Sequence, residues 1–145
     1  MLNEYSGKSK IMLIDGNEID QFICFQLLSK FFYTSKIQAF KNGQHAIEYI
    51  KITIKNLELF PHNLPDIIFL DPAMPVMDGF EFLETFEPIN KSLDYRIKVV
   101  TITSSVDPVY KEKCLNYKSV VKVLGKPMSK THLLELGMKI KPILN

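Results

Sequence analysis

The sequence predicts an α/β fold: three layers of the (βα)5 type, in which helices cover both faces of a parallel five-stranded sheet. Five short apolar runs recur along the 145 residues, and segments with helical periodicity lie between them and after the last. Strands that alternate with helices pair in parallel, because each crossover returns the chain to the same edge of the sheet with right-handed geometry. The run from Ile67 to Leu70 has no polar residue, as expected for a strand covered on both faces.

Each strand is predicted from one apolar run. The five runs are Lys10 to Ile14, Ser35 to Phe40, Asp66 to Leu70, Lys98 to Thr103 and Val120 to Leu124. Periodicity does not give their order in the sheet. We predict the flavodoxin-like order 2-1-3-4-5, which is the commonest solution for five βα units.

The first two helices are predicted from apolar stripes with i, i+3, i+4 spacing. The first stripe, which we expect to lie against the sheet, consists of Ile19, Phe22, Ile23, Gln26, Leu27 and Phe31. The second follows a turn at Asn42-Gly43 and consists of Ala46, Ile47, Ile50, Ile54 and Leu57.

The other three helices are predicted mainly from the residues at their ends. The third begins near Asp78-Gly79, and the fourth at Asp107-Pro108, where an N-cap acid precedes a proline at the first helical position. A final amphipathic segment runs from Leu133 to Ile140, after Lys126-Pro127 and before Pro142.

Composition limits the classes of function. With 46% hydrophobic and 23% charged residues, the chain resembles an ordinary globular domain, and no apolar run approaches the roughly 20 residues that a membrane span needs. We therefore expect a cytoplasmic protein. Cys24 and Cys114 lie far apart without metal-ligand spacing, so both are expected to be reduced and packed, and the scattered histidines argue against a zinc site.

Charge is distributed unevenly along the chain. Residues 1 to 96 hold 9 Lys and Arg against 13 Asp and Glu, whereas residues 97 to 145 hold 9 against 3. Such an asymmetry can mark a partner surface, but lysines that solvate the outer faces of the last helices also explain it. We favour the second interpretation and expect no nucleic-acid partner, because no pattern of interleaved aromatic residues and arginines suggests nucleic acid.

Polar residues follow four of the predicted strands where each strand ends. Asp15 follows the first, Asp71 the third and Lys126 the fifth, and Thr103 closes the fourth. Parallel strands bring these ends to one edge of the sheet, where open α/β folds bind their ligands. Two carboxylates held close together repel each other unless a cation lies between them, and Mg²⁺ uses such carboxylates together with water and phosphate oxygens. The sequence therefore predicts a site for Mg²⁺ and phosphate, with Asp71 as the first candidate for chemistry.

In this order and context, these residues resemble the receiver domain of response regulators in two-component signalling, over Lys10 to Ile140. The matching segments are Asp15 after IMLI, LDPAMPVMDGFEFL at residues 70 to 83, Thr103-Ser104-Ser105 after VVTI, and Lys126-Pro127 after VVKVLG. The segment TITSSVDP further resembles small stand-alone receivers. We therefore expect residues 1 to 145 to form a single receiver domain, with its core at about 10 to 140.

The resemblance implies the metal site and the acceptor. Asp71 matches the phosphoacceptor, whose carboxylate attacks a phosphoryl group on a partner's histidine and becomes an acyl phosphate. Asp15, Asp71 and the backbone carbonyl of Ala73 match the ligands of Mg²⁺.

The resemblance also implies the groups that contact the phosphoryl group. Lys126 pairs with it, and its bond to Pro127 resembles the cis peptide of the family. The Thr103 hydroxyl swings toward a phosphoryl oxygen, and the backbone amides of Ala73 and Ser104 are the other donors. Met74-Pro75 and Asp78-Gly79 match the turn that shapes the acceptor loop.

The partners implied are a histidine kinase or phosphotransfer protein and a downstream protein that binds the face of helix 4, strand 5 and helix 5. No DNA-binding, catalytic or membrane segment follows Ile140, so we expect output through protein contacts rather than substrate turnover.

Two departures from the family pattern affect these expectations. The family has a pair of acids after strand 1, but here the pair is Asp15-Gly16, and glycine offers no side-chain ligand. We therefore expect Mg²⁺ to bind more weakly, by about one to two orders of magnitude. Asn17 or Glu18 could compensate through a water molecule, but the sequence does not give the direction of their side chains. Val123 also replaces the strand 5 aromatic that commonly reports activation, so a switch must use another side chain.

Because of Gly16, a second hypothesis stays open: a receiver-like binding module that recognises its partner without phosphorylation. A third, an enzyme on the same fold, is less favoured. The loop from Asp15 to Glu18 would repel a flavin phosphate, and Ala73 occupies the position of the second acid in haloacid-dehalogenase-type phosphatases.

Overall fold

The computed structural model is a parallel five-stranded sheet covered by helices, and it describes residues 5–73, 77–105, 107–138 and 141–143. The strand order is β2-β1-β3-β4-β5, so the predicted fold class and strand order are confirmed. A single-turn 3-10 helix, η1 (Thr34–Lys36), precedes β2. The other elements are β1 (Ile11–Ile14), α1 (Glu18–Leu28), β2 (Ile37–Phe40), α2 (Gly43–Lys55), β3 (Ile67–Leu70), α3 (Gly79–Ser92), β4 (Lys98–Thr103), α4 (Pro108–Leu115), β5 (Val120–Gly125) and α5 (Lys130–Glu135).

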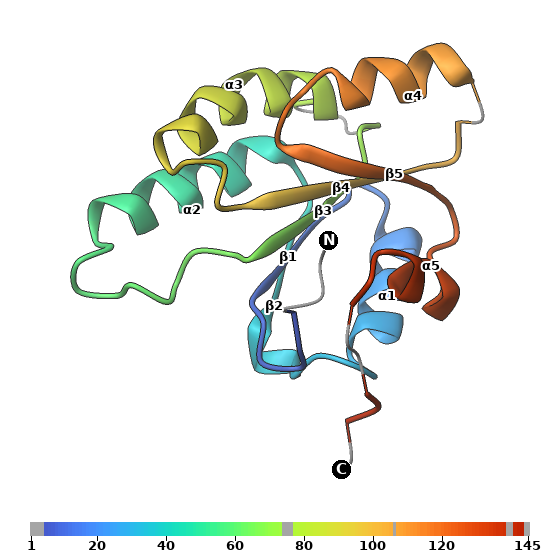
Figure 1. Ribbon diagram of the computed structural model, residues 1–145, viewed down its shortest axis with the longest axis horizontal. Helices are drawn as coiled ribbons and strands as arrows, with labels where there is room; N and C mark the ends of the chain where they lie inside the picture. The colour runs from blue at the N-terminus through green and yellow to red at the C-terminus, as the bar shows by residue number, and fades with distance from the viewer. Residues whose placement is uncertain (1–4, 74–76, 106, 139–140, 144–145) are drawn as a thin grey trace.

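The helices form two layers (Figure 1). Helices α1 and α5 lie on one face of the sheet, and α2, α3 and α4 lie on the other. Alternate strand residues supply the two cores: Leu13 and Phe69 pack toward α1 and α5, whereas Met12 and Ile68 pack toward α2 and α3. All four residues of both β1 and β3 are buried, which explains why these strands are uninterrupted apolar runs in the sequence.

A side-chain cap starts each of the five α-helices. The capping residues accept a hydrogen bond from a backbone N–H of the first turn, and they are Asn17, Asn42, Asp78, Asp107 and Ser129. The predicted starts of α2, α3 and α4 are therefore confirmed. At the start of α3, the N–H of Gly79 donates to the carbonyl of Pro72 at 2.7 Å, and a Cβ at position 79 would overlap the backbone of Pro72. Glycine is thus required where the loop after β3 closes.

The predicted range of the last helix, Leu133 to Ile140, is wrong. Helix α5 begins at Lys130 because Ser129 caps it, and it ends at Glu135. Gly137 adopts a φ of 79°, a left-handed conformation that suits glycine and stops the helix. Ile140 lies outside the described residues.

The predicted apolar stripe is right for Phe31, which is buried, and Leu27, which packs against the same core, but it is wrong for the first two turns of α1, where the helix turns a different face to the sheet. Its buried residues are Cys24 and Leu28. Three apolar residues of the predicted stripe are instead exposed, with relative exposures of 71% for Ile19, 62% for Phe22 and 43% for Ile23.

Gln21 accounts for this rotation of α1. Its side-chain amide donates to the backbone carbonyls of Asp15 and Phe40, at 3.1 and 2.9 Å, and so fixes the helix to the ends of β1 and β2. Gln21, Cys24 and Leu28 follow i, i+3, i+7 spacing and share one face. A polar anchor of this kind is invisible to an analysis of apolar periodicity.

Two further expectations concern the cysteines and membrane spans. Cys24 and Cys114 are free and buried, as predicted, and burial raises the pKa of both thiols, that of Cys24 to about 11. Among the described residues, none of the helices combines the length and the apolar character that crossing a membrane requires.

Asn90, near the end of α3, connects that helix to the start of β4 and to Ser119. Its side chain donates to the carbonyl of Ile97 at 2.7 Å and to the Ser119 hydroxyl at 2.8 Å, and it accepts from the N–H of Ile97 at 3.1 Å. Asn90 is fully buried, so water cannot replace these bonds.

We expect Asn90→Ala to lower the free energy of unfolding by about 3 kcal/mol, because it leaves buried backbone groups of Ile97 without partners. Urea denaturation measures the change. Asn63→Ala, at an exposed position, is the matched control and should change stability by less than about 0.5 kcal/mol. Equal stabilities for the two variants would contradict the role assigned to Asn90.

Candidate functional site

The candidate site lies at the carboxyl edge of the sheet, where backbone hydrogen bonds hold the residues that follow the strands. The N–H of Asp15 donates to Phe40, that of Asp71 to Ile14, and that of Lys126 to Thr103, at 2.9 to 3.1 Å. Each bond extends the parallel ladder by one residue. The side chains of Asp15, Asp71 and Lys126 therefore project from fixed backbone rather than from loose loops.

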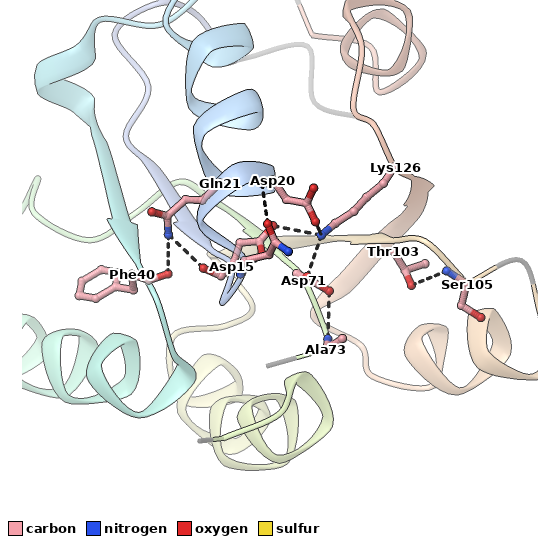
Figure 2. Close-up of polar contacts among 10 residues, drawn as sticks. Asp15, Asp20, Gln21, Phe40, Asp71, Ala73, Thr103, Ser105 and Lys126 are labelled. Carbon is pink, nitrogen blue, oxygen red and sulfur yellow. Dashed lines mark hydrogen bonds and ion pairs between the residues drawn. The ribbon is translucent and has the colours of Figure 1, made fainter. Parts of the chain in front are cut away.

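The Lys126 ammonium is the centre of the site (Figure 2). Its Nζ lies 2.7 Å from Asp71 Oδ2, 2.7 Å from Asp20 Oδ2 and 3.2 Å from Asp15 Oδ2. Asp15 and Asp71 are buried, whereas the Asp20 side chain is 37% exposed. One cation thus holds three carboxylates that come from different parts of the chain.

The loop backbone orients the two buried carboxylates. Asp15 Oδ1 accepts from the N–H of Asn17 at 2.9 Å, and Asp71 Oδ1 accepts from the N–H of Ala73 at 3.0 Å. In both residues one oxygen is therefore bound to the residue two positions later. The other oxygen of each faces the ammonium.

The electrostatics follow from burial and proximity. Burial, assisted by the charge of Asp71, raises the pKa of Asp15 from 3.8 to about 6, although the N–H of Asn17 and the ammonium of Lys126 oppose this. Burial also opposes the charged form of Lys126, but its hydrogen bonds to Asp20 and Asp71 and the charges of Asp71 and Asp15 outweigh this effect and raise the pKa of Lys126. The lysine is therefore firmly protonated.

Asp20 is the site residue that sequence reasoning missed. The two neighbours considered as substitutes for the missing acid face elsewhere: the Asn17 side chain caps α1, and Glu18 pairs with Lys41 at 2.8 Å on the exposed surface. Asp20 is the third residue of α1, and Asn17 accepts from its N–H at 3.0 Å. An Asn N-cap followed three residues later by an acid is a capping-type pattern that could have identified this position.

Thr103 lies at the same edge of the sheet, but its hydroxyl contacts the loop after β4 and helix α4 rather than the carboxylates. It accepts from the N–H of Ser105 at 3.0 Å. The phenol of Tyr110 on α4 lies close enough for the Thr103 hydroxyl to oppose the effect of burial, which raises the pKa of Tyr110. Tyr110 also makes an edge-to-face contact with Phe80 on α3, with ring centroids 5.3 Å apart. Thr103 is therefore connected to the helices of the opposite layer.

A small pocket of about 230 Å³ opens beside the carboxylates. Its lining comes from α1 and from the loops after β4 and β5: Asp20, Ile23, Cys24, Ser104, Lys126, Pro127 and Met128. The peptide between Lys126 and Pro127 is cis, as the resemblance implies. Ser104 thus lies near Lys126, where the resemblance puts a phosphoryl group, while Met74-Pro75 fall outside the described residues.

The residues present fit a divalent cation. One carboxylate oxygen from each of Asp15, Asp20 and Asp71 lies within 4.8 Å of the others, and hard oxygen donors of this kind suit Mg²⁺. All three carboxylates already form ion pairs with one positive charge, the ammonium of Lys126. Such a site can hold a cation and present the carboxylate of Asp71, beside a lysine, to an incoming electrophile.

Comparisons with known proteins agree with this geometry. The family model described as response regulator receiver domain matches residues 11–136. A similar solved structure is a two component response regulator from Cytophaga hutchinsonii, with 25% identity, a TM-score of 0.73 and coverage of 90% of this chain and 94% of that chain.

Two further similarities come from eukaryotes. A chain in the co-crystal structure of the Saccharomyces cerevisiae histidine phosphotransfer signaling protein Ypd1 and the receiver domain of its downstream response regulator Ssk1 has 22% identity and a TM-score of 0.66, with coverage of 91% of this chain and 87% of that chain. Hybrid signal transduction histidine kinase A of Dictyostelium discoideum is 24% identical over 123 residues. That match covers 84% of this chain but only 5% of the relative's length.

We expect Lys126→Gln to lower the free energy of unfolding by about 3 kcal/mol, because it leaves two buried carboxylates without their counter-charge. Urea denaturation in the presence of a chelator measures this change. The double variant Asp71→Asn, Lys126→Gln should recover part of the loss, since it removes one of the repelling charges. Lys41→Gln, which breaks an exposed ion pair, is the control and should leave stability unchanged. A double variant no more stable than Lys126→Gln alone would contradict the assigned interaction.

Proposed function

Because the chain belongs to the response regulator receiver domain family, we propose that it accepts a phosphoryl group on Asp71 and signals through protein contacts. The observation that carries this proposal is the position of the Asp71 carboxylate, 2.7 Å from the Lys126 ammonium and beside Asp15 at the carboxyl edge of the sheet. Receiver domains are a signalling family, generally without substrate turnover, and they bind Mg²⁺ at an acidic site.

In the proposed reaction, a carboxylate oxygen of Asp71 attacks the phosphorus of a phosphohistidine. The new O–P bond forms as the P–N bond breaks, and the electron pair of that bond leaves with the imidazole. Lys126 turns its ammonium from the carboxylates to the phosphoryl oxygens, and the amides of Ala73 and Ser104 donate to them. A bound Mg²⁺, held by Asp15, Asp71 and the carbonyl of Ala73, would neutralise charge on the transferred group.

We propose that the signal leaves the site through Thr103 and Tyr110. To reach a phosphoryl oxygen, the Thr103 hydroxyl must give up its bond to the N–H of Ser105 and move relative to the neighbouring Tyr110. Tyr110 would then be free to repack against Phe80, which changes the surface of α4. In this proposal Tyr110 replaces the strand 5 aromatic, whose position Val123 occupies here, as the side chain that responds to activation. The downstream partner binds the face of α4, β5 and α5.

We propose that the phosphodonor, a histidine kinase or phosphotransfer protein, binds over the first two turns of α1. The side chains of Ile19, Phe22 and Ile23 are exposed there. Large apolar side chains gathered on a surface commonly mark an interface. Ile23 also lines the pocket next to Asp20 and Lys126. A donor on this face would therefore be close to Asp71.

We place the domain in the cytoplasm. Two free, buried cysteines suit a reducing compartment, and cytoplasmic kinases would have access to it there.

A receiver-like binding module that acts without phosphorylation is the second candidate. The observation in its favour is Gly16, which provides no carboxylate where the family has its second acid. In this case the α1 surface and the α4 face would recognise a partner directly, and Asp71 would serve only as a counter-ion to Lys126.

We expect acetyl phosphate and Mg²⁺ to add one phosphoryl group to the wild-type chain, detected by intact-mass spectrometry. Asp71→Ala should abolish the increment, since it removes the attacking carboxylate. Asp94→Asn, a change of an exposed acid after the end of α3, is the matched control and should retain the increment.

Two results would decide against this proposal. Labelling that survives Asp71→Ala would refute the acceptor assignment. No labelling of the wild type, with labelling restored in Gly16→Asp, would establish the binding module instead.

We expect the double variant Phe22→Ala, Ile23→Ala to slow phosphoryl transfer from a phosphohistidine-bearing phosphotransfer domain by about tenfold, because interface anchors of this kind contribute about 1.4 kcal/mol or more. Labelling by acetyl phosphate should not change, since this small donor does not need the α1 surface. Phe60→Ala, at an exposed position beyond α2, is the control. Equal slowing with both donors would show that the variant damages the site rather than the docking surface.

A further inference from the structure

We propose that Asp20 supplies the carboxylate that Gly16 lacks and acts as a ligand for the divalent cation, directly or through one water. This inference rests on the proposed function, because it concerns the same cation that would assist Asp71. It goes further by moving the second acid of the metal site from the loop after β1 to the first turn of α1.

The geometry supports this role. Asp20 Oδ2 is as close to the Lys126 ammonium as Asp71 Oδ2 is, at 2.7 Å, so both acids already bind the same positive charge. The three carboxylate oxygens lie within 4.8 Å of one another. An octahedral Mg²⁺ with bonds of about 2.1 Å places adjacent ligands about 3.0 Å apart and opposite ligands about 4.2 Å apart, so the three oxygens would draw closer together on binding.

The charge balance points the same way. With Asp20, the site holds three carboxylates and one ammonium, a formal charge of −2 that matches a divalent cation. Without Asp20 the formal charge would be −1. Since Mg²⁺ affinity depends on the number of charged ligands, Asp20 offsets the loss expected from Gly16.

The orientation of Asp20 is not explained by its place at a helix start alone. Acids in the first turn of a helix are favoured by the helix dipole whichever way they point. Glu18, in the same turn, points to the surface and is 76% exposed, whereas Asp20 turns inward to Lys126. The cap at Asn17 fixes this difference, because it binds the N–H of Asp20 and sets where the helix begins.

Asp20 is also positioned at the entrance of the site. It lines the pocket beside Lys126, while Asp15 and Asp71 are more deeply buried. A cation that enters from solvent would therefore meet this carboxylate on its way to the buried pair. An alternative role, in which Asp20 only anchors Lys126, predicts no effect on cation affinity.

Isothermal titration calorimetry of the full chain with Mg²⁺, and with Mn²⁺ as a second probe, tests the inference without any phosphodonor. Asp20→Asn keeps the size of the side chain and removes its charge, and it should weaken binding about 10- to 100-fold. Glu18→Gln removes the same charge from the same helical turn, but away from the site, and should stay within about twofold of the wild type. The double variant Gly16→Asp, Asp20→Asn should recover most of the affinity.

Equal affinities of Asp20→Asn and Glu18→Gln would overturn the inference and leave Asp20 as an anchor of Lys126. Failure of the wild type to bind either ion would overturn it as well. Asp20→Ser, checked by circular dichroism, repeats the test with a second side chain if Asp20→Asn alters the fold. The mass increment on Asp71 is measured separately. If the wild type binds Mg²⁺ but gains no phosphoryl group, and Asp20→Asn weakens Mg²⁺ binding, the proposed function is refuted and the inference is retained.

Discussion

The ion pairs of Lys126 are the interaction on which the candidate site depends. Asp15 and Asp71 are buried next to each other, an arrangement that raises the pKa of Asp15 and would be unstable without a nearby cation. Lys126 provides that cation from a position 111 residues from Asp15 and 55 residues from Asp71 in sequence. Only the parallel topology makes this possible, because it brings the ends of β1, β3 and β5 to one edge. The parallel pairing of the strands therefore determines both the fold and the position of the site residues.

The sequence predicted those parts of the structure that depend on burial and on backbone caps. Buried parallel strands must be apolar along their length, so β3 was recognised from its four residues alone. The starts of α3 and α4 were predicted from Asp78 and Asp107, because capping is a local interaction between a side chain and the next turn. The convergence of Asp15, Asp71 and Lys126 followed from the strand ends and needed no knowledge of side-chain contacts.

The parts that could not be predicted depend on long-range polar contacts. The face that α1 turns to the sheet is set by Gln21, which bonds to two carbonyls at the ends of β1 and β2. Apolar periodicity instead favoured a stripe that includes Phe22, which the structure exposes. For Asp20, the local capping pattern gives its place in the first turn of α1 but not its partner, Lys126, which is 106 residues away in the sequence. A helix with apolar residues on two faces gives an ambiguous pattern, and tertiary hydrogen bonds decide between the faces.

This arrangement makes the first turns of α1 a physical connection between the site and the surface. Asp20 contacts Lys126, Gln21 contacts the sheet, and Phe22 and Ile23 are exposed, all within four consecutive residues. A displacement of Asp20 that accompanies cation binding must therefore move the exposed side chains next to it. If a cation changes the affinity of a donor for this surface, the donor must change the affinity for the cation by the same factor, because coupling between binding sites is reciprocal. If Asp20 binds the cation as proposed, an acid on α1, unlike one in the loop after β1, would give the metal site a direct part in the recognition of the proposed donor.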